Sequence, residues 1–346
     1  MSDINIRKQG KTGRITFTRP KALNALSYKM CLAIEEALDT WAEDSDVEMI
    51  VIDAEGDRAF CAGGDIGELY ETGTKGDFAY GQKFWADEYR MNAKLFEFPK
   101  PVAAFMHGFT MGGGVGVGGH ASHRVVGDSS QISMPECGIG LVPDVGGSYI
   151  LANAPGQTGV YLGLTAGRMD AADAIHAGFA DYYIPEANWP ALIAQLEETG
   201  DYAMIDAAAQ VPSESSLAKN QTQIDTHFSG AALGDILTSL KHDDSEFAVK
   251  TLKTMSRNSP LSMACTVVLI QRNRAFDNIR PALQQEYRFT YRAAEHTDFI
   301  EGIRAAIIDK DRTPKWRHSL EELPSVAVTQ MLMPLGDAQL TFEKGE

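Results

Sequence analysis

The sequence predicts an α/β protein whose strands and helices alternate in the first half and whose second half is helical. Two observations predict it. Short apolar runs alternate with amphipathic helical patterns up to residue 184, and strand–helix–strand repetition is typical of layered α/β folds. Beyond that residue the strand-like runs fade and helical periods dominate. With 346 residues, the chain predicts one large domain or two.

Four short segments predict the strands of the first half. Each is mostly apolar and is bounded by glycine, proline or charged residues. They are Arg14–Phe17, Met49–Asp53, Val102–Met106 and Arg124–Val126. Two helical patterns lie between these segments. One is capped by Ser27 and runs toward Asp44, and the other runs from Gly76 to Phe98.

Helical periods predict the elements of the second half. They cover Asn188–Thr199, Ser245–Arg257, Leu261–Phe276 and Ile279–Ala294. The change of pattern predicts a boundary near residue 190, which gives a core over residues 1–190 and a helical region over residues 191–346. We expect this region to end in a polar tail after Pro324.

The charge balance limits the partners. The chain has 47 Asp and Glu against 31 Lys and Arg, a net charge of −16 that repels a polyphosphate backbone, so we expect no nucleic-acid partner. A local basic rim could still bind a small anion. The first residues lack the apolar run of a signal peptide, and no stretch approaches the eighteen or so apolar residues of a membrane span. We therefore expect a soluble, intracellular protein with no membrane partner.

The four cysteines, Cys31, Cys61, Cys137 and Cys265, form no CxxC pair. Sparse cysteines without such spacing indicate reduced thiols in a cytosolic type of compartment. Cys61 and Cys137 flank candidate loops, but no adjacent base marks either one as a nucleophile, so we interpret both as packing residues.

Two glycine-rich turns could present backbone N–H groups to a ligand. Twelve of the forty residues from Gly108 to Gly147 are glycine. AFCAGGDI, at residues 59–66, and HGFTMGGGVGVGG, at residues 107–119, each follow a predicted strand. Free N–H groups where a helix begins can bind an anion or a developing oxyanion. Ordinary strand-to-helix turns are the alternative. A dinucleotide loop is disfavoured for the second turn, because no acidic residue lies where such a fold would place it.

Two carboxylates lie in the largely apolar segment Met134–Leu151. Glu136 and Asp144 are eight residues apart among Met, Ile, Leu, Val, Pro and Gly. Loss of solvation raises the pKa of a carboxylic acid toward the range that suits general acid–base chemistry. In the alternative interpretation each is a capping or solvated turn residue, and Asp144 would cap the helix that follows.

Taken together, these segments resemble the crotonase superfamily of acyl-CoA enzymes over nearly the whole chain. FTRPKALNALS resembles its CoA-adenine loop, AFCAGGDI and HGFTMGGG resemble the two halves of its oxyanion hole, and LTAGRMDAADAIHAGFAD resembles the segment that closes its core. The resemblance implies a crotonase-like ββα spiral core followed by an α-helical part. It also implies that the N–H groups of Gly64 and Gly113 hold a thioester oxygen. The CoA contacts that it implies are Lys21, Ala22, Ala25, Ala62, Asp65 and Ile66.

Within the superfamily, hydratases carry two catalytic glutamates. Here Gly116 occupies the first of those positions, Glu136 is kept at the second, and PDVGG supplies Asp144. Together with FWADEYRMN and with DFIEGIRAAIIDKDRTPKW, at Asp298–Trp316, this exchange resembles the 3-hydroxyisobutyryl-CoA hydrolases. The resemblance implies thioester hydrolysis, as in valine breakdown.

The same resemblance assigns roles to individual residues. Glu136 would either activate water or attack the carbonyl carbon, and the sequence does not choose between the two. Asp144 would orient the β-hydroxyl group or the water. Glu88 matches a substrate-contacting position, although a solvated helix charge would have the same pattern. Two other functions stay open. One is an enoyl-CoA hydratase or isomerase, which the missing carboxylate at Gly116 disfavours, and the other is a non-catalytic acyl-CoA-binding protein.

No cofactor is expected beyond the CoA of the substrate, and no metal is expected. His107, His120 and His123 alternate with glycine and fit core or solvated positions better than metal ligands. The superfamily implies a homo-oligomer such as a trimer or a hexamer, although its hydrolase members vary. The expected compartment is a bacterial cytosol or, for a processed protein, an organellar matrix. The exact acyl group is not predictable from the sequence.

Overall fold

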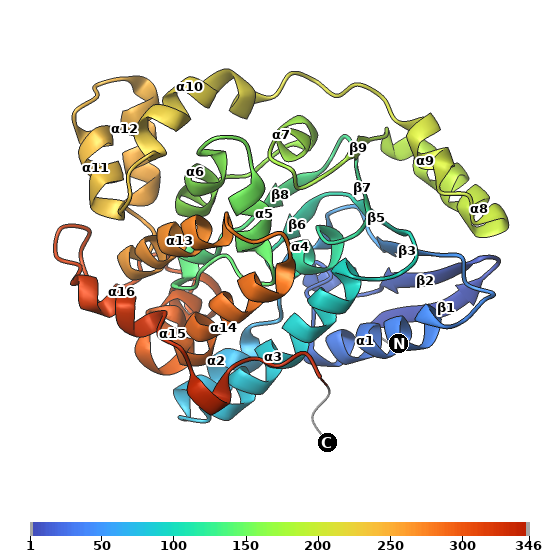
Figure 1. Cartoon of the computed structure of the whole chain (residues 1–346), viewed down its shortest axis with the longest axis horizontal. Helices are drawn as coiled ribbons and strands as arrows, with labels where there is room; N and C mark the ends of the chain where they lie inside the picture. Colours follow the sequence, from blue (N-terminus) through green and yellow to red (C-terminus); the bar gives the residue numbers. More distant parts are fainter. Residues whose placement is uncertain (1–2, 344–346) are drawn as a thin grey trace. The chain divides into compact units, whose positions relative to one another are not determined.

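The computed structural model describes residues 3–343, which form two β-sheets and many helices (Figure 1). The larger sheet has the strand order β1-β2-β3-β5-β7-β9. Strand β1 pairs with β2 in antiparallel orientation, and every other neighbouring pair is parallel. The strands of this sheet are β1 (Ile4–Gln9), β2 (Thr12–Phe17), β3 (Met49–Ala54), β5 (Val102–Met106), β7 (His123–Val126) and β9 (Tyr182–Tyr183).

The smaller sheet is parallel and has the order β4-β6-β8. Its strands are β4 (Ala59–Cys61), β6 (Phe109–Met111) and β8 (Gln131–Ser133). Carboxyl ends of parallel strands meet at one edge of a sheet. Gly64 follows β4 and Gly113 follows β6, so both glycine turns of the sequence leave this sheet from the same edge.

Helices make up most of the remaining chain. In the first half they are α1 (Tyr28–Ala42), α2 (Gly67–Thr74), α3 (Phe78–Phe96), α4 (Gly113–Gly118), α5 (Gly147–Asn153), α6 (Thr158–Thr165) and α7 (Ala171–His176). In the second half they are α8 (Trp189–Thr199), α9 (Ala203–Ala208), α10 (Ser216–Phe228), α11 (Leu233–Lys241), α12 (Glu246–Met255), α13 (Pro260–Asn273), α14 (Ile279–His296), α15 (Phe299–Ile303) and α16 (Ser325–Met331). Within residues 3–343, no strand follows β9.

The predicted α/β class is confirmed, and so are the individual strands and helices named above, with ends shifted by a few residues. Ser27 caps α1 as expected, because its side chain accepts a hydrogen bond from the Met30 N–H at 3.4 Å. The expected polar tail after Pro324 is wrong. Helix α16 forms there, and Met331 and Leu332 at its end are buried.

The core of the larger sheet is apolar on both faces. Strands β3 and β5 are central and parallel, and such strands are typically near-continuous apolar runs. Met49, Val51 and Phe105 pack with the α8 residues Trp189 and Leu192 in one buried cluster. The Trp189 indole N–H donates to the Ile184 carbonyl oxygen at 2.8 Å, which fixes the start of α8 beneath the sheet.

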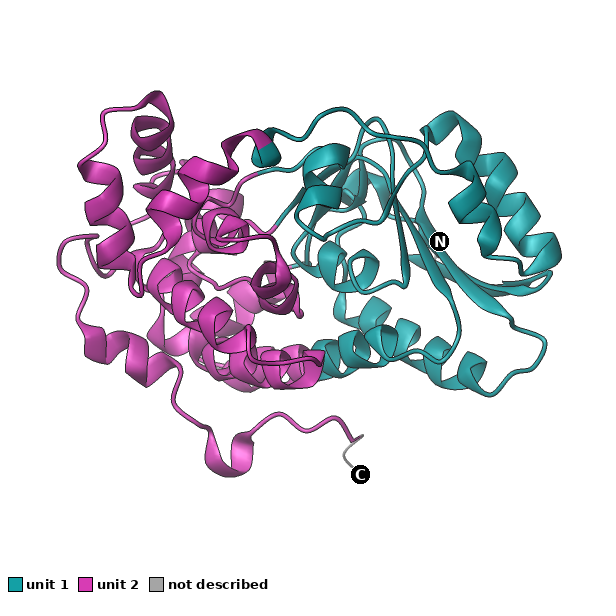
Figure 2. Ribbon diagram, turned by 45° about the horizontal axis from the view of Figure 1, so that its top comes forward, with its two compact units in different colours: residues 1–65, 87–133, 168–218 teal, residues 66–86, 134–167, 219–346 magenta. Residues whose placement is uncertain are grey.

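The contacts divide the chain into two compact units, each made of several segments (Figure 2). Unit 1 comprises residues 1–65, 87–133 and 168–218, and unit 2 comprises residues 66–86, 134–167 and 219–346. Helix α3 begins in unit 2 and ends in unit 1, whereas α10 begins in unit 1 and ends in unit 2. The boundary near residue 190 stays a prediction, because these units group residues by contact and not by secondary structure.

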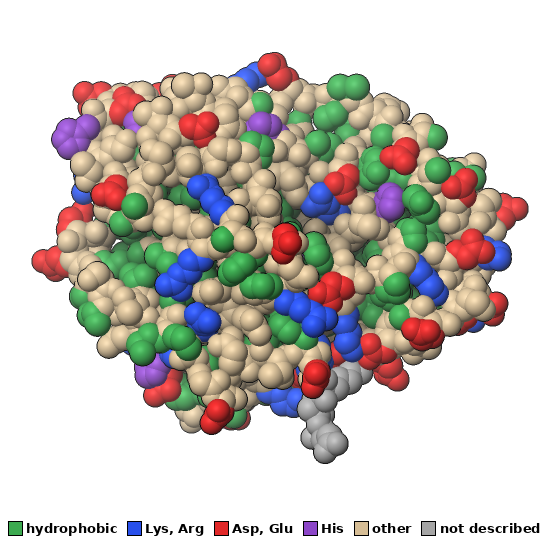
Figure 3. Space-filling model, viewed as in Figure 1, with side chains coloured by type: hydrophobic (Ala, Val, Ile, Leu, Met, Phe, Trp, Pro, Cys, Tyr) green, Lys and Arg blue, Asp and Glu red, His purple; other side chains and the backbone are tan. Residues whose placement is uncertain are grey.

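The surface and the thiols agree with the composition. Acidic and basic side chains are interspersed with hydrophobic ones on the face drawn in Figure 3. All four cysteines are buried and none forms a disulfide. Among the described residues, no helix combines the length and the hydropathy that a transmembrane span requires.

Candidate active site

In unit 1 the two predicted oxyanion donors lie side by side. A Cβ atom built on Gly113 would lie 3.2 Å from the Gly64 nitrogen. Gly113 is the first residue of α4, so its N–H has no partner within the helix. Within residues 3–343, neither the Gly64 nor the Gly113 N–H donates a hydrogen bond to another group. The two free donors therefore meet at one point, and the glycine at position 113 leaves that point open.

Glycine is required around these donors. Gly112 precedes α4 with φ 47° and ψ −117°, a conformation that side chains with a Cβ rarely adopt. A Cβ on Gly114 would lie 2.1 Å from the Cys61 carbonyl oxygen. The first turn of α4 thus packs directly on β4, which explains why three glycines occur in succession.

Glu88 belongs to the same part of unit 1. It lies on α3 and is 3% exposed, so the alternative of a solvated helix charge is wrong. A carboxylate oxygen of Glu88 would be 3.2 Å from a Cβ on Gly113, the same distance as the Gly64 nitrogen. Glu88 therefore lies beside the two N–H donors, as expected for a substrate contact.

The segment predicted to hold CoA pairs with the segment after β4. The Ala62 N–H donates to the Leu23 carbonyl oxygen at 3.0 Å, and the Leu26 N–H donates to the Gly63 carbonyl oxygen at 2.9 Å. The buried Asn24 amide donates to the Ala59 carbonyl oxygen at 2.8 Å.

These bonds bring five of the six predicted CoA residues into two adjoining stretches of unit 1. They are Lys21, Ala22, Ala25, Ala62 and Asp65. The sixth, Ile66, is the first residue of unit 2 and precedes α2. Lys21 and Ala22 are exposed at the end of this loop, where a ligand could reach them.

In unit 2 both predicted carboxylates are buried. Glu136 is 4% exposed and Asp144 is 5% exposed. Burial raises the pKa of Glu136 well above its usual value, and the charges of Asp144 and Glu286 raise it further. The Glu136 Oε2 atom has no hydrogen-bond partner among residues 3–343. An unpaired buried oxygen of this kind costs stability, so packing of the core alone does not account for it.

Glu286 is a third carboxyl group of this cluster, and sequence reasoning missed it. It lies on α14, is fully buried, and accepts hydrogen bonds from the Gly146 N–H at 2.8 Å and the Ser148 N–H at 3.1 Å. The Ser148 hydroxyl also donates to it. Burial raises the pKa of Glu286 to about 8, although these hydrogen bonds favour its charged form. One signal could have revealed it, because Glu286 is spaced three residues from the apolar residues Leu283 and Phe289.

The turn after Asp144 is shaped by these contacts. Glu286 accepts hydrogen bonds from the Gly146 and Ser148 N–H groups at the start of α5, whose N-cap residue is Gly146. Val145 has φ 53°, and Gly146 follows with φ 79°. A positive φ at a β-branched residue is rare and costs about 1–3 kcal/mol. The surroundings therefore hold Asp144 on a strained turn.

The C-terminal motif Asp298–Trp316 packs on the loop that carries Glu136. A Cβ on Gly302 would lie 2.1 Å from the Ile139 carbonyl oxygen, and a Cβ on Gly140 would lie 2.5 Å from the Asp298 carbonyl carbon. Both contacts exclude side chains. The motif that supports the subfamily resemblance is thus in direct contact with the turn Glu136–Ile139.

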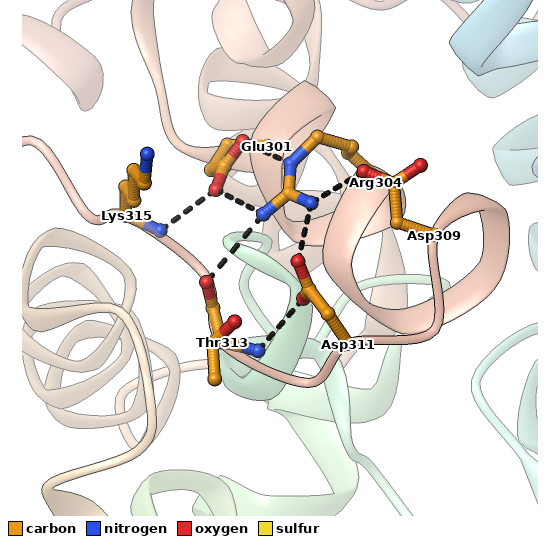
Figure 4. Close-up of polar contacts among 6 residues, drawn as sticks. All are labelled: Glu301, Arg304, Asp309, Asp311, Thr313 and Lys315. Atoms are coloured by element: carbon orange, nitrogen blue, oxygen red, sulfur yellow. Dashed lines mark hydrogen bonds and ion pairs between the residues drawn. The ribbon is translucent and has the colours of Figure 1, made fainter.

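Arg304 lies within this motif and forms ion pairs with three of its acidic residues (Figure 4). It lies on a π-helical turn, Arg304–Ile308, and forms ion pairs with Glu301 at 2.8 Å, Asp309 at 2.6 Å and Asp311 at 2.7 Å. The Trp316 indole N–H donates to the Arg257 carbonyl oxygen at 3.1 Å, which anchors the end of the motif as expected.

Other candidate groups lack the properties of catalytic or metal-binding residues. Burial raises the pKa of the Cys61 and Cys137 thiols to about 12, so neither is a ready thiolate. His107 and His120 are buried. Within the described chain, no three His, Cys, Asp or Glu side chains are grouped as metal ligands. Gly116 lies within α4 and offers no carboxyl group.

Comparisons with known proteins bear on the family and the fold of the chain. A family model described as enoyl-CoA hydratase/isomerase matches residues 12–332. A relative named 3-hydroxyisobutyryl-CoA hydrolase, mitochondrial, from Danio rerio is 37% identical over 92% of this chain and 86% of its own length. Its namesake from Homo sapiens is 33% identical over 98% of this chain and 91% of its own length.

Two solved structures share the fold with a TM-score of 0.95 each. One is described as an enoyl-CoA hydratase from Rhodobacter sphaeroides 2.4.1. It is 55% identical and covers 98% of this chain and 100% of its own. The other is described as a carnitinyl-CoA dehydratase from Mycobacterium thermoresistibile. It is 37% identical and covers 100% of both chains.

Proposed function

Because the chain belongs to the enoyl-CoA hydratase/isomerase family, with the crotonase fold expected from its sequence, we propose that it hydrolyses the thioester of 3-hydroxyisobutyryl-CoA or of a close 3-hydroxyacyl-CoA. The products are the free acid and CoA, as in valine catabolism. The observation that carries the proposal is the buried pair Glu136 and Asp144 in a chain that has glycine at position 116. Relatives named for this hydrolase activity support it over most of their length.

The first step is polarisation of the thioester. The N–H groups of Gly64 and Gly113 would hold the carbonyl oxygen, and both are free and adjacent in unit 1. Each donor is worth about 3 kcal/mol when the oxygen becomes negative in the transition state. Glu88 beside them would contact the acyl part of the substrate.

Glu136 would deliver the nucleophile in one of two ways. As a general base it takes a proton from water while the water oxygen bonds to the carbonyl carbon. The C–S bond then breaks, and the CoA thiolate takes up the proton from Glu136. As a nucleophile it forms a mixed anhydride with loss of the thiolate, and water then cleaves the anhydride. The unpaired Oε2 atom of Glu136 fits both routes.

Asp144 would orient the β-hydroxyl group or the attacking water. Its strained turn and the Glu286 contacts around it hold it in place in unit 2. CoA would run along Lys21, Ala22, Ala25, Ala62, Asp65 and Ile66, as part of the substrate, and no other cofactor or metal takes part.

We further propose a homo-oligomer, for which trimers and hexamers are the precedent in the superfamily. The compartment would be a bacterial cytosol or an organellar matrix, and the mitochondrial relatives are consistent with the second. Both statements are independent of the catalytic proposal.

A direct test compares two substrates on the same enzyme preparation. Free thiol is measured with a thiol-reactive dye, and enoyl absorbance is followed in parallel, with 3-hydroxyisobutyryl-CoA and crotonyl-CoA. We expect thiol release from the first and no loss of absorbance from the second. Glu136→Gln and Asp144→Asn should each reduce thiol release by about 10²-fold or more. Unchanged rates in both variants would refute the proposed roles.

A hydratase activity is the second candidate, and the 55% identical structure described as an enoyl-CoA hydratase favours it. Gly116 opposes it, because adding water across a double bond would lack one carboxyl group worth about 10²–10⁴-fold. Loss of enoyl absorbance from crotonyl-CoA without thiol release would establish the hydratase. Tight binding of both esters with no turnover of either would instead indicate an acyl-CoA-binding protein.

A further inference from the structure

A groove with a volume of about 670 Å³ lies wholly within unit 2, outside the residues assigned to catalysis. The start of α13, the end of α14 and helix α16 form its walls. The volume is within the range of about 300–1,000 Å³ that is typical of small-molecule sites. On the face drawn in Figure 3, Lys and Arg side chains lie beside hydrophobic ones over α14 and α16.

One wall of this groove carries two arginines whose guanidinium groups have no carboxylate partner among residues 3–343. Arg292 and Arg317 line it together with His296 and His318. Arg292 donates only to backbone carbonyl oxygens, among them that of Met333 at 2.9 Å. Arg317 donates from its guanidinium group to the Glu295 carbonyl oxygen at 3.2 Å. Within residues 3–343, neither arginine has a carboxylate oxygen within 4.0 Å.

This lack of counter-ions is unusual for a chain with a net charge of −16. Arg292 is partly buried, and this burial lowers its pKa. A positive charge in such surroundings is stabilised by an anion that enters the groove. Guanidinium groups present N–H donors in a planar fork that matches a carboxylate or a phosphate.

Part of the lining of the groove forms an apolar wall that is partly open to water. Val326 is 58% exposed and Met333 is 51% exposed, and both are among the large hydrophobic side chains on the surface. Leu261 and Met331, which are 2% and 3% exposed, form the buried part of the same wall. An inorganic anion would leave Val326 and Met333 in water, whereas a ligand with an apolar tail would cover them.

We propose that this groove binds the anion of a carboxylic acid that has an apolar tail, such as a medium-chain fatty acid. The carboxylate would lie at Arg317 and Arg292, and the tail would lie along Val326 and Met333. The arginines and the apolar side chains both contribute to the affinity. An anion without a tail and an apolar molecule without a charge should therefore each bind more weakly.

Methionine methyl groups give a local test on the full chain. The protein is labelled with [methyl-¹³C]methionine, and the Met331 and Met333 signals are assigned with methionine-to-leucine variants. Octanoate is then titrated, with 1-octanol and inorganic phosphate as separate arms. We expect saturable shifts of the Met331 and Met333 signals with octanoate, at a Kd of about 1 mM or tighter, and at least about tenfold weaker effects in the other two arms.

Two variants with a matched control complete the experiment. Arg317→Gln removes an exposed charge from the groove and should weaken octanoate binding about tenfold, because a charge-assisted hydrogen bond to the carboxylate is lost. Val326→Asp places a negative charge on the exposed apolar wall and should abolish binding. Lys253→Gln removes the same charge from an exposed position on α12, outside the groove, and should leave the Kd unchanged.

Several results would overturn the proposal. These are no saturable shift at Met331 and Met333, equal binding of octanol or of phosphate, or the same Kd for Arg317→Gln and Lys253→Gln. Thiol release from 3-hydroxyisobutyryl-CoA is not part of this readout, so the proposed site and the proposed catalytic function can fail independently.

Discussion

Replacing Gly113 with alanine should remove turnover and preserve the fold. The added Cβ would lie 3.2 Å from the Gly64 nitrogen. An oxyanion must approach its N–H donors to about 2.7–3.1 Å, so the methyl group would occupy the place of the thioester oxygen. With about 3 kcal/mol for each of two donors, the loss is about 6 kcal/mol, or about 10⁴-fold in kcat/KM.

The same substitution should change stability little. A contact at 3.2 Å requires its neighbours to shift by a few tenths of an ångström, at a cost of about 1 kcal/mol. Alanine is favoured over glycine by up to about 1 kcal/mol in a helix interior, and at Gly113, the first residue of α4, it recovers part of this amount. The free energy of unfolding in urea should therefore stay within about 1 kcal/mol of the wild type.

Two other glycines provide matched controls. A Cβ on Gly114 would lie 2.1 Å from the Cys61 carbonyl oxygen, so Gly114→Ala should destabilise the fold. A Cβ on Gly234 in α11 meets nothing within 4 Å, so Gly234→Ala should not destabilise the fold and should leave activity unchanged. Thiol release and urea unfolding are measured for all three variants. Full activity in Gly113→Ala at wild-type stability would refute the assignment of the oxyanion hole.

Two further predictions concern titratable groups. Because burial and Asp144 raise the pKa of Glu136, a base or nucleophile at this position requires kcat/KM to rise with pH, with a midpoint above about 4.3, and Asp144→Asn should lower that midpoint. A pH–rate profile of Asp144→Asn whose midpoint equals or exceeds that of the wild type would contradict the effect of Asp144 on Glu136. Burial raises the pKa of Glu35, but hydrogen bonds from Arg90 and Lys94 outweigh burial and the net pKa is lowered. Arg90→Met should therefore cost about 2 kcal/mol in urea unfolding at pH 7, with Lys94 still 2.9 Å from Glu35, and this cost should shrink below about pH 4 as Glu35 is protonated.

Local patterns predicted the regular elements better than the short ones. Ser27 and the apolar face that follows it identified α1, and the apolar run Val102–Met106 identified β5. Strand β4 was not predicted, because three residues are too few to show an alternation of apolar and polar side chains. Helix α16 was not predicted, because its seven residues are too few to show a helical period, even though four of them are apolar.

Those residues of the candidate site that stand out within their own short segment could be predicted from the sequence. The two glycine turns and Glu136 lie in short segments that carry their own signal. Glu286 could not be found in this way, because it is 150 positions from Glu136 in sequence and meets the cluster only through tertiary packing. The strain at Val145 is likewise a property of the folded surroundings, since valine by itself favours extended backbone.

The interleaving of the two units has a consequence for how the protein is made. Unit 1 needs residues up to 218, and unit 2 uses segments that begin at residue 66 and continue to the end of the chain. Domains generally fold in order as they leave the ribosome, at about 5–20 residues synthesised per second. Here the first segments of unit 1 must wait for strand β9 and helix α8, while residues 66–86 and 134–167 wait for the helices that follow α10. Apolar surface of these early segments thus stays uncovered during most of translation. A premature stop codon near the end of the coding sequence would leave segments of the first half without the helices that they pack against.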